Sequence, residues 1–374
     1  MSAPNGTLSG DGAGTGAPGA RRLRIFVTGI GGLIGSTLAE IAHGVGHSVY
    51  GIDSDQRGRW FGHAGSVTWR IDQLVRMGIR VVRADFRERL RLVDGADLVV
   101  HCASQPSHDF SRTHVLEDSA INYTGTVALL EAVRTHAPRA VFAFLSTNKV
   151  YGAAVNDWAY RIVGERLVPE PVGRHPLGVD ESMRVDASTH TPFGVSKLAA
   201  DLMVQEYRRT FGLTTVSFRC GCLTGPGGTA VEMQGFLGYL VHCAVTGKPY
   251  TIYGLAGYQV RDNIDAGDVA RAVLAYAAAP KADVYNLGGG PANAISIREA
   301  IAYLRDRHGC SFEVTNGPAR WADHKWWITD TARFERDYPF WARTSITETI
   351  DALVASERAR MSATHPAENH HAVG

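Results

Sequence analysis

Apolar runs of strand length alternate with segments of helical period from about residue 23 onward. This alternation is typical of a parallel sheet that is wrapped by helices. Ile34, Leu38, Ile41 and Val45 recur at helical spacing and predict one buried helix face. The pattern predicts strands at Arg24–Thr28, Ser48–Ile52, Arg80–Ala84, Leu98–His101, Val141–Ser146 and Thr215–Arg219, and further helices at Asn122–Arg134 and Val195–Thr210.

A glycine-rich turn, residues 28–35, joins the first strand to the first helix. Glycines at such a turn allow a tight bend, a close backbone approach to a pyrophosphate, and close packing of helix on strand. Asp53 ends the next strand, where a carboxylate can accept hydrogen bonds from an adenosine ribose and disfavours a 2′-phosphate. We therefore predict NAD rather than NADP, although the nearby Arg57 and Arg59 favour the opposite choice. The expected cofactor contacts are Gly29, Gly32, Leu33, Ile34, Asp53, Asp85, Phe86 and Ala103.

After about residue 220 the chain changes to short segments punctuated by Gly and Pro, which favours a smaller domain of loops and short elements. The predicted fold class is α/β, with a Rossmann-type doubly wound parallel sheet and a smaller C-terminal substrate-binding domain. The expected divisions are a disordered tail at 1–21, an NAD-binding domain at 22–220, a substrate-binding domain at 221–357 with some chain exchange between the two, and a loose tail at 358–374.

The charge balance, the hydropathy and the cysteine content limit the binding partners, the cellular location and the metal sites that we expect. The 38 basic and 37 acidic residues leave no broad field to attract nucleic acid or an anionic membrane. No apolar stretch reaches the roughly 18 residues of a membrane span, and no secretory signal is evident, so we expect a cytoplasmic protein. The five cysteines are scattered in apolar contexts, and we expect reduced thiols and no metal site.

Several ordered motifs over residues 23–350 resemble the extended short-chain dehydrogenase/reductases. They are the glycine turn, Asp53, Asp85-Phe86, and the stretches at 101–105, 122–126, 146–152 and 194–197. Within these enzymes the chain is most similar to the CDP-tyvelose (CDP-paratose) 2-epimerase group. That closer likeness rests on SerThrAsnLysValTyrGly at 146–152, GlnValArgAsp at 259–262 and TyrAsnLeuGlyGlyGly at 285–290.

The resemblance implies a catalytic set of a Ser or Thr, a Tyr and a Lys, in which the Tyr takes a proton from a sugar hydroxyl. Thr147 matches the first position, and Lys197 matches the Lys, which also holds the nicotinamide ribose. The Tyr position, four residues before Lys197, is Phe193. A phenyl ring can neither accept nor donate that proton.

Three interpretations of this departure remain open. Another group serves as the base, with Lys149, His190, His108 and Tyr151 the nearest candidates by motif. Alternatively, the reaction is an elimination whose acid and base lie elsewhere. As a third possibility, the protein binds NAD without reacting. The leading prediction is an NAD-dependent nucleotide-sugar epimerase, with an NAD-dependent dehydratase or a non-catalytic NAD-binding or regulatory protein as alternatives.

The resemblance also implies a substrate site and a partner. Arg261 and Arg320 match the arginines that such enzymes present to nucleotide phosphates, whereas an alternative pairs Arg261 only with Asp262 or Asp265. We expect the substrate, a nucleotide- or nucleoside-linked sugar, to contact Gln105, His108 and Asn148 as well. Helices at 122–134 and 196–208 resemble those that form a two-fold dimer, so we expect a homodimer.

Overall fold

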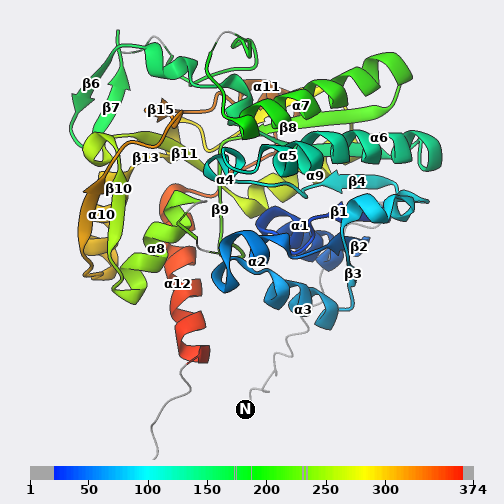
Figure 1. Ribbon diagram of the computed structural model, residues 1–374, viewed down its shortest axis with the longest axis horizontal. Helices are drawn as coiled ribbons and strands as arrows, with labels where there is room; N and C mark the ends of the chain where they lie inside the picture. The colour runs from blue at the N-terminus through cyan, green and yellow to red at the C-terminus, as the bar shows by residue number, and fades with distance from the viewer. Residues whose placement is uncertain are drawn as a thin grey trace, which may run out of the picture.

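Seven parallel strands form the main sheet of the protein (Figure 1). The computed structural model describes residues 21–364, apart from residues 172, 174, 187, 230, 233 and 234. The strand order is β12-β8-β5-β4-β1-β2-β3, and every neighbouring pair is parallel. The bounds are β1 Arg24–Thr28, β2 Ser48–Asp53, β3 Arg80–Arg83, β4 Leu98–His101, β5 Val141–Thr147, β8 Thr214–Cys220 and β12 Val284–Leu287.

Helices cover both faces of this sheet, because successive strand side chains point to opposite sides. Ile25 and Val27 belong to one core with α1 and α9, whereas Phe26 belongs to a second core with α6 and α7. This arrangement confirms the predicted doubly wound α/β fold. The helices around the sheet are α1 Leu33–Gly44, α2 Gln56–Phe61, α3 Thr68–Arg76, α4 His108–Ser111, α5 Val115–Ser119, α6 Gly125–His136, α7 Pro192–Phe211, α9 Ala266–Ala278 and α11 Ala332–Asp337.

The ends of α7 follow from its sequence. Thr191 accepts a hydrogen bond from the Gly194 N–H, and Pro192 stands in the first turn, where a missing N–H costs nothing. Gly212 ends the helix in the left-handed conformation, with φ at 69°. These signals place Phe193 and Lys197 in the first two turns, at the carboxyl edge of the sheet.

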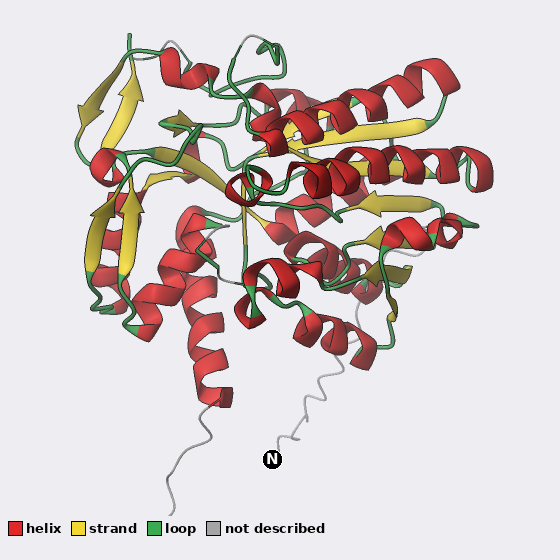
Figure 2. Ribbon diagram, in the orientation of Figure 1, coloured by secondary structure: helices red, strands yellow, loops and turns green. Residues whose placement is uncertain are grey.

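A smaller lobe, at the left of Figure 1, holds the remaining strands and helices. Figure 2 shows short strands and long connections in this lobe, as the Gly and Pro punctuation predicts. Its elements are β6 Tyr160–Val163, β7 Arg166–Pro169, β9 Cys222–Thr224, α8 Phe236–Thr246, β10 Tyr250–Tyr253, β11 Val260–Asp265, β13 Ala294–Ser296, α10 Ile297–His308, β14 Val314–Gly317, β15 Trp326–Trp327 and α12 Ile346–Thr364.

Three expectations need correction. Val45 is 63% exposed, because α1 ends at Gly44 and Val45 only caps it. The strand β12 was not predicted, because its four residues lead into a Gly and Pro run. Helix α12 continues to Thr364, so residues 358–364 are helical and do not belong to a loose tail; residues 1–20 and 365–374, where the tails are expected, lie outside the described part.

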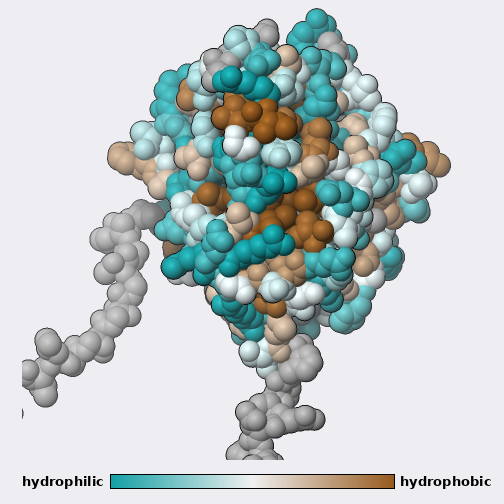
Figure 3. All heavy atoms as spheres, turned by 90° about the vertical axis from the view of Figure 1, so that its left-hand side faces the viewer, coloured by the Kyte–Doolittle hydropathy of each residue, from teal (hydrophilic) through white to brown (hydrophobic). Residues whose placement is uncertain are grey.

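The surface of the smaller lobe mixes apolar and polar side chains. Figure 3 shows apolar patches between polar ones on the face at the left of Figure 1. On β6, which lies on that side, Ile162 and Val163 are exposed. Within the described residues, none of the helices is both long enough and apolar enough to span a membrane.

Candidate active site

The glycine turn between β1 and α1 leaves no room for side chains. Gly29 has φ at 67°, and a Cβ on it would lie 2.7 Å from the backbone nitrogen of Ala103. A Cβ on Gly35 would lie 2.3 Å from the Gly29 oxygen. Gly32 caps α1 without a side-chain hydrogen bond, and the first turn carries no acidic residue. The amide groups of this helix end are therefore suited to a phosphate, and the turn fits a dinucleotide.

A small hollow beside the turn contains the predicted adenosine contacts. Asp53 accepts hydrogen bonds from the N–H groups of Gly31 at 2.9 Å and Asp55 at 2.8 Å. Burial raises the pKa of Asp53, and these two amides oppose the shift. The hollow is lined by Gly29, Gly32, Asp53, Asp85, Phe86 and Ala103, among others. The Asp85 carboxylate is engaged by Arg87 at 2.6 Å, so it shapes the hollow with one charge already paired.

Arg57 connects this hollow to the main cleft and lines both. Its guanidinium donates to the Thr229 hydroxyl at 2.7 Å, which ties the segment after β2 to the loop after β9. Burial lowers the pKa of Arg57 to about 10, so the side chain remains a cation at neutral pH. Local spacing shows Arg57 only as a cation near Asp53 that disfavours NAD; its reach to Thr229 cannot be read from the sequence.

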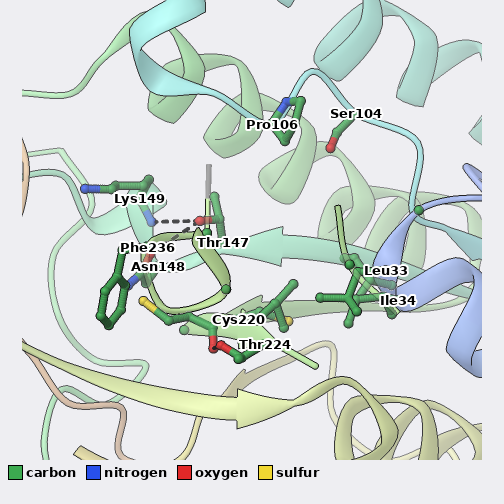
Figure 4. Close-up of a pocket in the computed structure, with 18 of the residues that line it drawn as sticks. Leu33, Ile34, Ser104, Pro106, Thr147, Asn148, Lys149, Cys220, Thr224 and Phe236 are labelled. Atoms are coloured by element: carbon green, nitrogen blue, oxygen red, sulfur yellow. Dashed lines mark hydrogen bonds between the residues drawn. The ribbon is translucent and has the colours of Figure 1, made fainter. Parts of the chain in front are cut away.

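The main cleft, of about 400 Å³, runs between the sheet edge and the smaller lobe. Figure 4 shows Leu33 and Ile34 at one end, and Thr147, Asn148 and Lys149 toward the other. Most of the predicted catalytic and substrate residues meet here: Thr147, Lys149, Phe193, Lys197, His108, Asn148, Arg261 and Arg320. Asp323 and Ser146 also line the cleft, and the sequence analysis assigned no role to either.

Phe193 closes the cleft where the family resemblance leads one to expect a phenol. Its ring is buried, and its backbone N–H donates to Ser111 at 3.1 Å. Lys197, one turn later, donates to the Leu145 oxygen at 2.6 Å and lies 4.0 Å from the centre of the Phe144 ring. Burial lowers the pKa of Lys197 to about 8. The lysine is thus held against β5, and no tyrosine stands among the described residues that line the cleft.

A buried set of charges stands at the other end of the cleft. Lys149 Nζ lies 3.2 Å from one oxygen of Asp323, and Arg261 lies 3.0 Å from the other. The two cations hold the pKa of Asp323 well below its usual range, whereas burial lowers the pKa of Lys149. Arg261 therefore pairs with Asp323, and not with Asp262 or Asp265 as the alternative had it. Because 174 residues separate Lys149 from Asp323, no sequence spacing could show this pair.

His108 begins α4, above the same charges. Its Nε2 is buried and has no hydrogen-bond partner among the described residues, and the nearest carboxylate oxygen, of Asp109, lies 3.6 Å away. Burial and the charge of Lys149 lower the pKa of His108 to about 4, so the ring is neutral at neutral pH. The Ser146 hydroxyl is likewise buried without a partner. Both residues line the cleft, and neither of these polar atoms has a hydrogen-bond partner among the described residues.

Arg320 lies at the mouth of the cleft. Its Nε is 3.8 Å from Asp109, its guanidinium stacks 4.3 Å from the centre of the Tyr253 ring, and one nitrogen donates to the Glu232 oxygen at 3.1 Å. The ion pair is long and partly open to solvent, so the guanidinium keeps the ability to bind an incoming anion.

Three candidate site residues, His190, Tyr151 and Gln105, do not line the cleft. Both ring nitrogens of His190 lie 2.9 Å from backbone oxygens, those of Ser188 and Val150. The Tyr151 hydroxyl donates to Asn286 at 2.7 Å and accepts from Arg219 at 3.1 Å. Neither residue is among those that line the cleft.

Gln105 is the third. It has a fully buried side chain outside the cleft lining. Its backbone N–H donates to Asn122 at 2.9 Å, whose side-chain amide returns a bond to the Gln105 oxygen at 3.1 Å. Asn122 lies in a π-helical turn, Ala120–Thr124, between α5 and α6. This turn directs the Asn122 side chain at the loop after β4, and so fixes the backbone that presents His108.

Comparison with known proteins gives concordant matches. The model of the NAD dependent epimerase/dehydratase family matches residues 25–288. The chain is 32% identical over 322 residues to a CDP-paratose 2-epimerase from Salmonella typhi, with 82% of this chain and 91% of the relative covered. It is 29% identical over 248 residues to a dTDP-glucose 4,6-dehydratase from Salmonella typhimurium, covering 57% and 62%.

A solved structure has the same fold. The UDP-glucose 4-epimerase of Thermotoga maritima, determined with UDP-glucose, superimposes with a TM-score of 0.74 at 21% identity. The superposition covers 91% of this chain and 100% of that one.

Proposed function

Because the chain belongs to the NAD dependent epimerase/dehydratase family, we propose that it is an epimerase that inverts one carbon of a nucleotide-linked sugar. The observation that carries this proposal is a single cleft in which a dinucleotide-type glycine turn meets buried cations and unpaired polar groups. The CDP-paratose 2-epimerase relative, of which this chain covers 91%, supports a CDP-linked sugar as the substrate.

NAD is the cofactor of this family, and the glycine turn between β1 and α1 leaves room for its pyrophosphate. When bound, it accepts a hydride from a sugar carbon and later returns it to that carbon. We propose that Gly29, Gly32, Leu33 and Ile34 hold the pyrophosphate and Asp53 the adenosine ribose. Asp85, Phe86 and Ala103 would form the wall of the adenosine hollow, and Lys197 would hold the nicotinamide ribose.

The other side chains of the cleft would serve the sugar and its phosphates. Thr147 and Asn148 offer hydrogen bonds to the reacting hydroxyl. The Lys149 ammonium, fixed by Asp323, stabilises the negative charge that grows on that oxygen as its proton leaves. Arg320 and Arg261 supply positive charge for the phosphates, with Arg261 already oriented by Asp323.

We also propose a homodimer formed through α6 and α7, the helices expected at 122–134 and 196–208, together with α5. Both α5 and α6 contact α7, and α5 and α7 expose several apolar side chains. Leu116 is 87% exposed and Val195 is 55% exposed, with Val115 and Leu202 also exposed. A second copy of the chain would bury these groups.

A cytoplasmic location is part of the proposal, and the five free thiols support it.

Mass measurement and NMR of the products test the reaction. Purified protein is incubated with CDP-paratose and with CDP-, UDP- and ADP-linked hexoses. An epimerase leaves the mass of one of these sugars unchanged and alters the coupling constants at one carbon. Loss of one water would instead favour a dehydratase, as in the dTDP-glucose 4,6-dehydratase relative. If no sugar changes, and denatured protein releases no dinucleotide, the proposal is wrong.

A further inference from the structure

Oxidation of a sugar hydroxyl requires a group that accepts the hydroxyl proton, and most polar groups of this cleft are already engaged. Lys197 donates to the Leu145 oxygen. Lys149 is the ion-pair partner of Asp323, and an ammonium in such a pair has no lone pair to offer. The Thr147 hydroxyl accepts from the Lys149 backbone at 3.2 Å and is a poor base at neutral pH. Phe193 contributes no proton acceptor.

His108 is different in both chemistry and contacts. It lines the cleft, and its side chain is only 17% exposed. Its Nε2 is buried and makes no hydrogen bond within the described residues. The ring sits on a fixed support, because the Ser107 hydroxyl accepts from the Phe110 N–H at 3.3 Å and caps α4. His108 thus lines the cleft with no hydrogen bond that commits its Nε2 to another described residue.

The charged groups around His108 are balanced. Lys149 from the turn after β5 and Arg320 from the loop before β15 disfavour a proton on the ring. Asp109 from α4 and Asp323 from that same loop favour one. With burial added, the pKa of the free ring falls to about 4, so the ring keeps its lone pair throughout the neutral range but is a weak base until that pKa rises. The diphosphate of a bound nucleotide sugar would add negative charge and raise that pKa.

We propose that His108 is the general base that replaces the missing tyrosine, with a ring nitrogen accepting the proton of the reacting sugar hydroxyl. This inference rests on the proposed function. The O–H bond breaks and an N–H bond forms on His108, while the C–H electron pair leaves as hydride to NAD and a ketone forms. In the return half, the hydride adds to the other face of the ketone and His108 gives its proton back to the oxygen. Nearby Lys149 repels the protonated ring and favours that return.

The first test compares three variants in a single-turnover experiment with CDP-paratose as probe, following the near-ultraviolet absorbance of reduced dinucleotide. His108→Gln keeps the size and polarity but cannot carry the proton, and we expect the rate to fall by about 10²–10⁴-fold. Free imidazole added to His108→Ala should restore part of the rate in a saturable manner. His114→Ala is the matched control, because this exposed histidine stacks on Phe110 at 4.0 Å, outside the cleft lining, and should retain the wild-type rate.

A second readout does not depend on turnover. Nitrogen NMR of histidine-labelled protein, assigned by comparison with His108→Gln, should show a neutral His108 ring at neutral pH. Addition of CDP alone should raise its pKa, because the phosphates lie near the ring. A His108 signal that CDP leaves unchanged would place the ring outside the substrate site and overturn the inference.

The outcomes separate this inference from the proposed function. If the wild-type protein converts none of the sugars, the proposed function fails and the assignment of His108 fails with it. If the wild type converts CDP-paratose or another sugar of the set and His108→Gln does so within about threefold of its rate, only the assignment of His108 is wrong.

Discussion

At the scale of single residues, the phenyl ring of Phe193 determines which contacts Lys197 makes. A phenol at this position would share the charge of Lys197, whereas the phenyl ring leaves Lys197 bonded to a backbone oxygen and facing Phe144. The ion pair of Lys149 with Asp323 and the His108 ring lie at the opposite end of the cleft from α1. Two substitutions probe the charged end of the cleft and the adenosine hollow separately.

Lys149→Met tests the charged end. We expect the rate of sugar oxidation to fall by roughly 10²–10³-fold, because the growing oxyanion loses the ammonium and Asp323 loses one partner. Affinity for CDP, measured by calorimetry, should stay within about threefold of the wild type, since Arg320 and Arg261 remain. Lys248→Met, at an exposed position, is the control. An active Lys149→Met protein would show that this ammonium is dispensable.

Asp53→Ala tests the choice of cofactor. The carboxylate is held by two backbone amides and would repel a 2′-phosphate, so its removal should raise NADP affinity relative to NAD by about tenfold or more. Fluorescence titration of protein freed of cofactor measures both affinities. Asp72→Ala, which removes an exposed carboxylate paired with Arg83, should leave the ratio unchanged. An unaltered preference in Asp53→Ala would argue against the ribose contact.

At the scale of elements, the sequence pattern predicted the central strands well and the smaller lobe poorly. The bounds Arg24–Thr28 and Leu98–His101 are confirmed, because buried parallel strands are short apolar runs between polar turns. The strands β10 and β14 pair across the smaller lobe with partly exposed residues and no continuous apolar run, so pattern alone did not indicate them. Their partners lie far apart in the chain.

In the candidate site, too, local features could be predicted from the sequence and contacts between distant residues could not. The glycine turn is a local signal, and the structure confirms its geometry. The contact of Lys149 with Asp323 depends on how the smaller lobe folds back, which local spacing does not encode. The sequence also does not show whether the His190 ring binds backbone oxygens or faces the substrate, because it does not reveal which way a side chain points. In the structure both ring nitrogens lie near backbone oxygens.

The exposed apolar side chains of α5 and α7 allow the proposed homodimer to be tested. Leu116→Glu combined with Leu202→Glu places charges on the exposed apolar side chains that a second copy would bury. We expect a dimeric wild type to become monomeric, as measured by sedimentation velocity, with unchanged circular dichroism. Phe340→Glu is the control, since this residue is 99% exposed in the segment after α11. A monomeric wild type would refute the proposed dimer directly.

At the scale of the whole molecule, buried titratable groups predict how stability varies with pH. Burial lowers the pKa of His101 to about 3 and of His108 to about 4, and that of His324 well below 6.5. As the pH falls below 6.5, the unfolded chain binds protons at these rings and the folded protein does not, so stability decreases. Burial raises the pKa of Asp118 and Asp262 to about 6, which acts in the opposite direction below that pH.

The pKa values of His101 and His108 fall by more than those of Asp118 and Asp262 rise, so the net effect of acid is a loss of stability. The melting temperature should therefore decrease as the pH is lowered from 6.5 toward about 4, as measured by differential scanning calorimetry at constant ionic strength. His101→Gln removes one of the three rings, so its melting temperature should depend less steeply on pH than that of the wild type. A melting temperature that rises over this range would show that the carboxyls dominate.

The position of β12 at the edge of the main sheet affects how the protein is made. Translation delivers β8 first, and Val284–Leu287 emerges only after most of the smaller lobe has been synthesised. Until then the outer edge of β8 has no neighbour and can pair with a strand of another nascent chain. Ribosome pausing between these two strands would therefore increase aggregation, whereas a pause late enough for Leu287 to have left the ribosome would not.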